Sequence, residues 1–161
     1  MASDMFIKIG DIEGESADDA HEKEIDVLAW SWGMSQSGSM HAGGGGGAGK
    51  VSVQDLSFTK WVDKATSPLM LACCNGTHIP EITLTVRKAG KKPLETLVVT
   101  MKECIVSSIS TGGTPGEDRL TESVTLNFAY VETAYQPQKA DGSKDGGTID
   151  MKWNIKENVE G

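Results

Sequence analysis

The stretch that decides the fold class is VTLNFAY, residues 124–130. Its bulky apolar residues occupy every second position, and Thr125, Asn127 and Ala129 lie between them. Strict alternation is typical of a β-strand that has one face in a hydrophobic core and the other in contact with solvent. The stretch therefore predicts a strand of a half-buried sheet.

Alternation recurs along the whole chain. It predicts further strands at residues 5–9, 28–34, 51–60, 82–87, 97–109 and 149–156. In the second of these runs, the large side chains at Leu28, Trp30, Trp32 and Met34 are expected to face the core. The third run loses its alternation at Gln54–Asp55, where a β-bulge is expected.

One segment has the signals of a helix instead. Ser67 is a suitable N-cap, Pro68 suits the first helical position, and Asn75–Gly76 is a typical C-terminal stop. Together with the strands, this segment predicts a mainly β, single-domain protein over residues 1–161. The expected fold is a β-barrel of two sheets with one short flanking α-helix and a long glycine-rich loop, with a β-sandwich as the related arrangement.

Length and charge narrow the function classes. The chain has 161 residues and a formal net charge of −8, which argues against broad binding to nucleic-acid phosphates. The longest apolar run, 69–74, is too short to cross a membrane, and the acidic N-terminus resembles no secretory signal. We expect the protein to fold in the cytoplasm and to leave the cell only by a route that carries folded protein.

No constellation of residues predicts catalysis, a metal or a cofactor. The cysteines Cys73, Cys74 and Cys104 form no CxxC motif, and no histidine lies at a metal-ligand spacing from them. They are expected to act as small hydrophobic residues. The carboxylates of Asp18–Asp19 are expected to be solvated, and Glu117–Arg119 is expected to form an exposed ion pair within its loop. The sequence therefore predicts a protein that is not an enzyme.

Glycine is the compositional anomaly of the chain. Eight of its 19 glycines lie between Gly33 and Gly49, five of them in tandem. Residues 44–50 match the GxxxxGK opening of a phosphate-binding loop, but Val51 stands where the motif needs Ser or Thr to hold Mg²⁺. A strand pattern also follows where that motif requires a helix. The preferred interpretation is a long loop over 35–50, in which glycine permits close approach to a neighbouring subunit.

The run before this loop has an unusually small outward face. Ala29, Ser31 and Gly33 alternate with the bulky residues of the same run. Small side chains allow a second surface to come close, or line a smooth cavity. An ordinary exposed strand face is the alternative interpretation, and β-patterning does not separate the two.

Three long blocks of the chain resemble the haemolysin-coregulated protein (Hcp) family of bacterial type VI secretion. They begin with MFIKIGDIEGES, EIDVLAWSWGM and STGGTPGEDRL and cover residues 5–16, 24–78 and 110–147. The resemblance implies a β-barrel that forms six-membered rings, which stack into the inner tube of a contractile machine. It also implies a spike protein and a sheath as partners, export by the type VI route without a signal peptide, and effector toxins as cargo of some members.

The resemblance also assigns roles to the two features above. It implies that the glycine-rich loop contacts neighbouring subunits and stacked rings, through Ser39, Met40, His41, Gly43, Gly44, Gly45, Gly46, Gly47 and Lys50. The small face of Ala29, Ser31 and Gly33 is the expected contact with effectors in the ring lumen. The competing hypothesis is a monomeric β-sandwich that acts as a binding or adaptor module.

Overall fold

The chain folds into a six-stranded barrel with a short extension. The structure is a computed structural model that describes residues 3–38, 49–90 and 92–161. One antiparallel sheet has the strand order β10-β9-β8-β5-β2-β1-β6-β7 and closes through a second pairing of β8 with β7. The strands of this sheet are β1 (Ser3–Ile9), β2 (Ile25–Ser31), β5 (Leu56–Trp61), β6 (Ile79–Lys88), β7 (Leu94–Gly112), β8 (Thr121–Tyr135), β9 (Ile149–Asn154) and β10 (Val159–Glu160).

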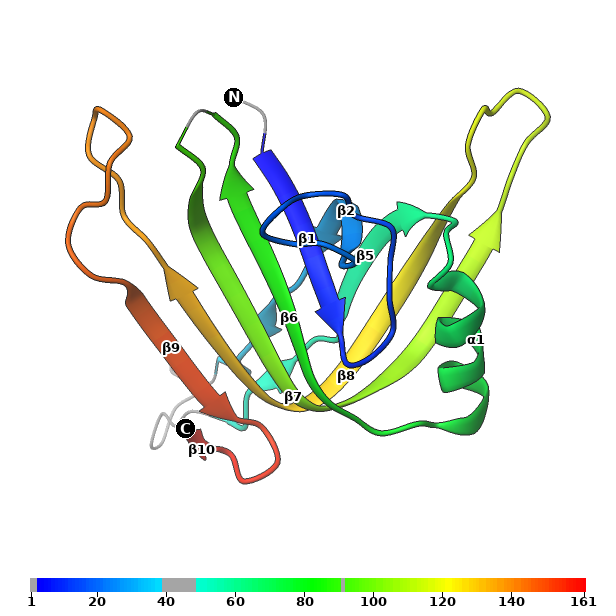
Figure 1. Cartoon of the computed structure of the whole chain (residues 1–161). Helices are drawn as coiled ribbons and strands as arrows, with labels where there is room; N and C mark the ends of the chain where they lie inside the picture. Colours follow the sequence, from blue (N-terminus) through cyan, green and yellow to red (C-terminus); the bar gives the residue numbers. More distant parts are fainter. Residues whose placement is uncertain (1–2, 39–48, 91) are drawn as a thin grey trace.

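The two longest strands join the two halves of the barrel. The first half of β8 pairs with β5, whereas its second half pairs with β9, and β7 follows β8 along almost its whole length. Figure 1 shows both strands curving through the molecule, with the helix on one flank and β9 and β10 on the other. The predicted mainly β barrel with one flanking helix is confirmed, and its two layers are continuous through β7 and β8.

The core fills the barrel with side chains from alternate strand positions. The predicted alternation of residues 124–130 is confirmed: Val124 and Leu126 are buried, and Thr125 and Asn127 lie on the other face of the strand. The fully buried hydrophobic residues are Ile7, Ile9, Ile25, Leu56, Ala65, Leu69, Ile82, Leu84, Met101, Cys104, Val124, Leu126 and Val131. Burial also raises the pKa of the Cys104 thiol to about 12, which agrees with its predicted role as a small hydrophobic residue.

Two strand predictions needed correction. In β2 the pairing with β5 shifts between Val27 and Ala29, so Val27 and Trp30 both face inward while Leu28 is 38% exposed. Met34, 47% exposed, belongs to a separate two-stranded ribbon of β3 (Met34–Ser35) and β4 (Ser52–Val53). The break expected to be a bulge at 54–55 is the point where the chain leaves this ribbon and enters the barrel.

The helix α1 spans Thr66–Asn75, and its N-cap is Ala65 rather than the predicted Ser67. The turn before it is organised by Asp63, whose carboxylate accepts the Ala65 N–H at 2.9 Å, and by Thr66, whose hydroxyl accepts the Asp63 N–H at 3.0 Å. At the other end, Gly76 has φ 64° and its N–H bonds to the Ala72 carbonyl, which confirms the predicted stop. Among the described residues, no helix has the length and apolar character that a membrane crossing requires.

A buried ion cluster connects this helix to the barrel. Lys60 and Glu122 are paired across β5 and β8, and both side chains are fully buried. The Lys60 ammonium lies 2.7 Å from the Glu122 carboxylate and 2.8 Å from that of Asp63. Thr66 in the first turn of α1 donates its hydroxyl to Glu122 at 2.9 Å. The strand pattern places Lys60 on the inward face, where a cation is stable only with such partners.

Residues 10–24, here called the strap, cover the outer face of β1 and β6. Figure 1 shows this segment passing in front of β1. Within it, His21 is buried and stacks on Phe6 with ring centroids 4.5 Å apart. Its two ring nitrogens lie 2.8 Å from Glu24 and 3.1 Å from Glu95. The acidic segment is therefore packed onto the sheet through His21.

Arg87 of β6 is the main anchor of the strap. Its guanidinium binds the Asp18 carboxylate with both terminal nitrogens, at 2.9 and 2.6 Å, and reaches Asp4 at 3.3 Å. The prediction that Asp18 is solvated is thus wrong, and the bonds from Arg87 lower the pKa of Asp18. Because the pKa is lower in the folded state, this pair stabilises the fold above the ordinary pKa of a carboxyl group. The stabilisation is lost as the pH falls through the folded value.

Candidate functional site

The small outward face predicted on β2 belongs to a larger surface that crosses four strands. We call it the hydroxyl face. Cross-strand pairing aligns its residues in two rows, Ala29–Thr59–Ser123–Ser110 and Ser31–Ser57–Thr125–Ser108. All eight residues are exposed or half-buried, because they alternate with inward-facing core residues on the same strands. Seven of the eight carry a hydroxyl group, the exception being Ala29, and none carries a charge.

Polar groups border this face at one edge, and an aromatic ring with a cation over it borders the other. At one edge, the Asp55 carboxylate accepts hydrogen bonds from the Ser107 hydroxyl at 2.9 Å and the Asn127 amide at 2.8 Å. At the other, the Arg119 guanidinium lies over the Trp61 ring at 4.6 Å, in place of the loop ion pair predicted for Glu117–Arg119. The central rows therefore form a neutral, small-residue surface that a second molecule can approach closely.

The predicted site residues are placed as follows. Ala29 and Ser31 are exposed on the hydroxyl face, whereas Gly33 follows the strand and lies beside the Gln54 side chain. Of the predicted loop contacts, only Lys50 is among the described residues, and it is exposed. Ser39, Met40, His41 and Gly43–Gly47 lie outside the described residues.

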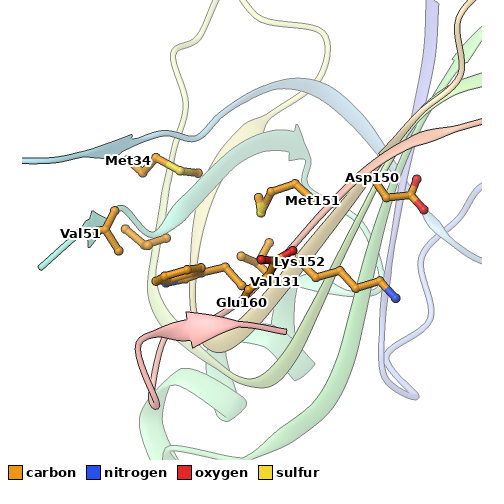
Figure 2. Close-up of a pocket in the computed structure, with 9 residues that line it drawn as sticks. Met34, Val51, Val131, Asp150, Met151, Lys152 and Glu160 are labelled. Atoms are coloured by element: carbon orange, nitrogen blue, oxygen red, sulfur yellow. The ribbon is translucent and has the colours of Figure 1, made fainter. Parts of the chain in front are cut away.

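A second surface lies where the glycine-rich loop leaves the molecule. The β3–β4 ribbon forms one wall of a groove of about 360 Å³, and β9 and β10 form the other. Figure 2 shows Met34 and Val51 on one side of this groove and Met151, Asp150 and Lys152 on the other. The remaining lining residues are Val53, Val131, Trp153 and Glu160. The groove is thus apolar with charged groups at its rim, which is typical of a protein-contact surface.

Sequence reasoning missed most of the hydroxyl face. Ser57, Thr59, Ser123 and Thr125 occupy the polar positions of their alternating runs, which is the only sequence signal they carry. Their grouping depends on the order and register of β2, β5, β8 and β7, which alternation alone does not define. The groove was not predicted because residues 51–60 were expected to form a single strand. In the structure they contribute to two strands, β4 of the ribbon and β5 of the barrel.

The structure thus combines a small closed β-barrel with a neutral face of small residues and an apolar groove. A family model described as "Type VI secretion system effector, Hcp" matches residues 6–135. The curated protein hcp1 of Pseudomonas aeruginosa is 68% identical over 99% of both chains. A crystal structure of Hcp1 from Salmonella typhimurium is 42% identical with TM-score 0.82, again over 99% of both chains.

A structure titled as a type six secretion system protein is 30% identical, with TM-score 0.94, and covers 99% of this chain and all of its own. The chain therefore belongs to the Hcp family of type VI secretion. This family consists of structural, secreted components of type VI secretion.

Proposed function

We propose that this chain is the tube subunit of a type VI secretion machine. Six copies form a ring, rings stack into a tube, and the hydroxyl face lines the lumen. Support comes from family membership and, above all, from the two rows of small neutral residues across four strands. A lumen wall needs a surface without large or charged side chains, so that the channel stays wide and cargo approaches the backbone.

The partners in this proposal follow from the tube. Copies of the chain contact each other through the glycine-rich loop, including Lys50, and the apolar groove at its root provides further contact area. A spike protein and a sheath complete the machine, and effector toxins are carried in the lumen. The subunit assembles in the cytoplasm and is then secreted by the type VI route.

The decisive experiment measures mass and shape together. A hexamer has six times 17.1 kDa, about 103 kDa, whereas the competing monomeric binding module stays at 17.1 kDa. We expect light scattering to give the larger mass and negative-stain images to show annuli with a central pore. A monomer over the accessible concentration range contradicts the proposal.

A substitution tests the lumen assignment separately. Ser31→Gln places a long side chain at the β2 end of the second row, next to Ser57 on β5. We expect it to weaken the capture of a cognate effector and to leave the ring intact, since Ser31 is exposed and outside the core. The readout is effector pull-down with the ring mass measured in parallel.

The matched control is Ser143→Gln, which changes an exposed serine in the loop after β8, away from the hydroxyl face. It should leave effector capture at the wild-type level. If Ser31→Gln also captures the effector at the wild-type level, Ala29 and Ser31 are not part of the cargo-binding surface.

A further inference from the structure

A cleft at one end of the barrel brings together lysines from two distant parts of the sequence. It has a volume of about 610 Å³ and lies between the turn joining β6 to β7 and the loop that follows β8. Figure 1 shows these two segments side by side at the end of the barrel where the N-terminus lies. Lys88 and Lys92 line it from the turn, and Lys144 lines it from the loop.

These three ammonium groups have no carboxylate partner within 4.0 Å among the described residues. The Lys88 ammonium has only the neutral Gln138 amide oxygen, at 3.3 Å. In a chain of net charge −8, three lysines around one cleft form a local region of opposite sign. Like charges that line one cleft without a carboxylate partner favour the binding of an anion there.

The acidic groups nearby are mostly committed elsewhere. Asp141 lines the cleft, but one of its carboxylate oxygens accepts both the backbone N–H and the hydroxyl of Ser143, at 2.9 and 2.6 Å. These bonds lower its pKa. Glu95 is held by His21 on the neighbouring strap, and Asp145 is exposed beside Lys144. In the described part of the chain, Asp141 is thus the one carboxylate that lines the cleft, and it forms no ion pair with the three lysines.

One wall of the cleft is a turn held by its own backbone hydrogen bonds. The Gly142 N–H bonds to the Lys139 carbonyl at 2.9 Å, and the Lys139 N–H bonds to the Ser143 carbonyl at 2.8 Å. Gly142 has φ +86°, and a Cβ there would lie 3.6 Å from the Lys88 ammonium. The absence of a side chain thus leaves the Lys88 ammonium beside bare backbone, open to a small ligand.

We propose that this cleft is a binding site for a phosphate-type oxyanion, with Lys88, Lys92 and Lys144 as its ligating side chains. Lysine ammonium groups bind phosphate as mobile point charges, each with three donors. Three of them match the charge and the several acceptor oxygens of a phosphate or diphosphate better than those of a single carboxylate. The site is independent of the loop that resembles a phosphate-binding motif, and of the tube proposal.

Calorimetric titration of the intact protein with inorganic phosphate and then pyrophosphate, at constant ionic strength, tests the site. We expect saturable binding, with a dissociation constant on the order of a few millimolar for phosphate and a lower one for pyrophosphate. The double variant Lys92→Gln/Lys144→Gln should weaken pyrophosphate binding about tenfold. Both lysines are exposed, so the variant is expected to fold.

The matched control is Lys8→Gln/Lys156→Gln, which removes the same charge from two exposed lysines outside the cleft. Its affinity should equal that of the wild type. An equal loss of affinity in both double variants would show diffuse attraction and overturn the site, as would the absence of saturable binding. Binding of a glutamate-rich peptide with no binding of pyrophosphate would also overturn it, in favour of an acidic protein partner.

Discussion

Replacing Glu122 with alanine is expected to lower the free energy of unfolding by about 3 kcal/mol or more. The substitution leaves the Lys60 ammonium fully buried with Asp63 as its remaining carboxylate partner, 2.8 Å away. It also removes the acceptor of the Thr66 hydroxyl at the start of α1. The barrel and the helix are therefore destabilised together. Urea unfolding followed by circular dichroism measures the loss, at one protein concentration so that assembly contributes equally.

Two further variants separate the causes of this loss. Glu117→Ala removes an exposed carboxylate from a loop and should change stability by less than about 0.5 kcal/mol. Glu122→Gln keeps the size of the side chain and one acceptor oxygen but removes the charge. Its loss of unfolding free energy should therefore be smaller than that of Glu122→Ala and larger than that of Glu117→Ala. If Glu122→Ala and Glu117→Ala unfold at the same urea concentration, the buried cluster contributes no measurable stability to the fold.

The cluster shows where sequence reasoning about this fold ends. Alternation predicted every long strand, and Asn75–Gly76 marked the end of the helix, because these signals are local. Lys60 occupies a position of β5 that alternates with the outward-facing residues and therefore points into the core. A lysine at such a position gives no sign in the sequence that it is buried. Of the two carboxylate partners of Lys60, Asp63 is near in sequence, but Glu122 is 62 residues away, and only the pairing of β5 with β8 brings it to Lys60.

The candidate site was predictable to the same limited extent. Ala29 and Ser31 stood out because small residues alternate with tryptophans within one strand. The hydroxyl face became visible only when register aligned four strands, and the lysine cleft needs two loops that are about 50 residues apart. Local pattern thus predicts which way a side chain points, and tertiary pairing decides what it is grouped with.

Replacing Gly14 with alanine is expected to lower the free energy of unfolding by about 2–3 kcal/mol. A Cβ at this position would lie 2.5 Å from the Glu24 carbonyl oxygen and 2.7 Å from the Ile25 Cα. Both are backbone atoms, one in the last residue of the strap and one in the first residue of β2, so the clash is not relieved by a side-chain rotation. The Gly14 N–H also bonds to the Lys23 carbonyl at 2.7 Å, and this bond closes the strap on itself.

Hydrogen exchange would locate the damage, because the strap should open before the barrel does. Faster exchange is expected for the Ser16 and Lys23 amides, which bond to carbonyls within the strap, and not for the core amides of β8. Gly116→Ala is the control, since a Cβ there meets nothing within 4 Å. Equal stability of the two variants would mean that the strap can move away without cost. The contacts of Arg87 and His21 would then contribute little to holding residues 10–24 on the sheet.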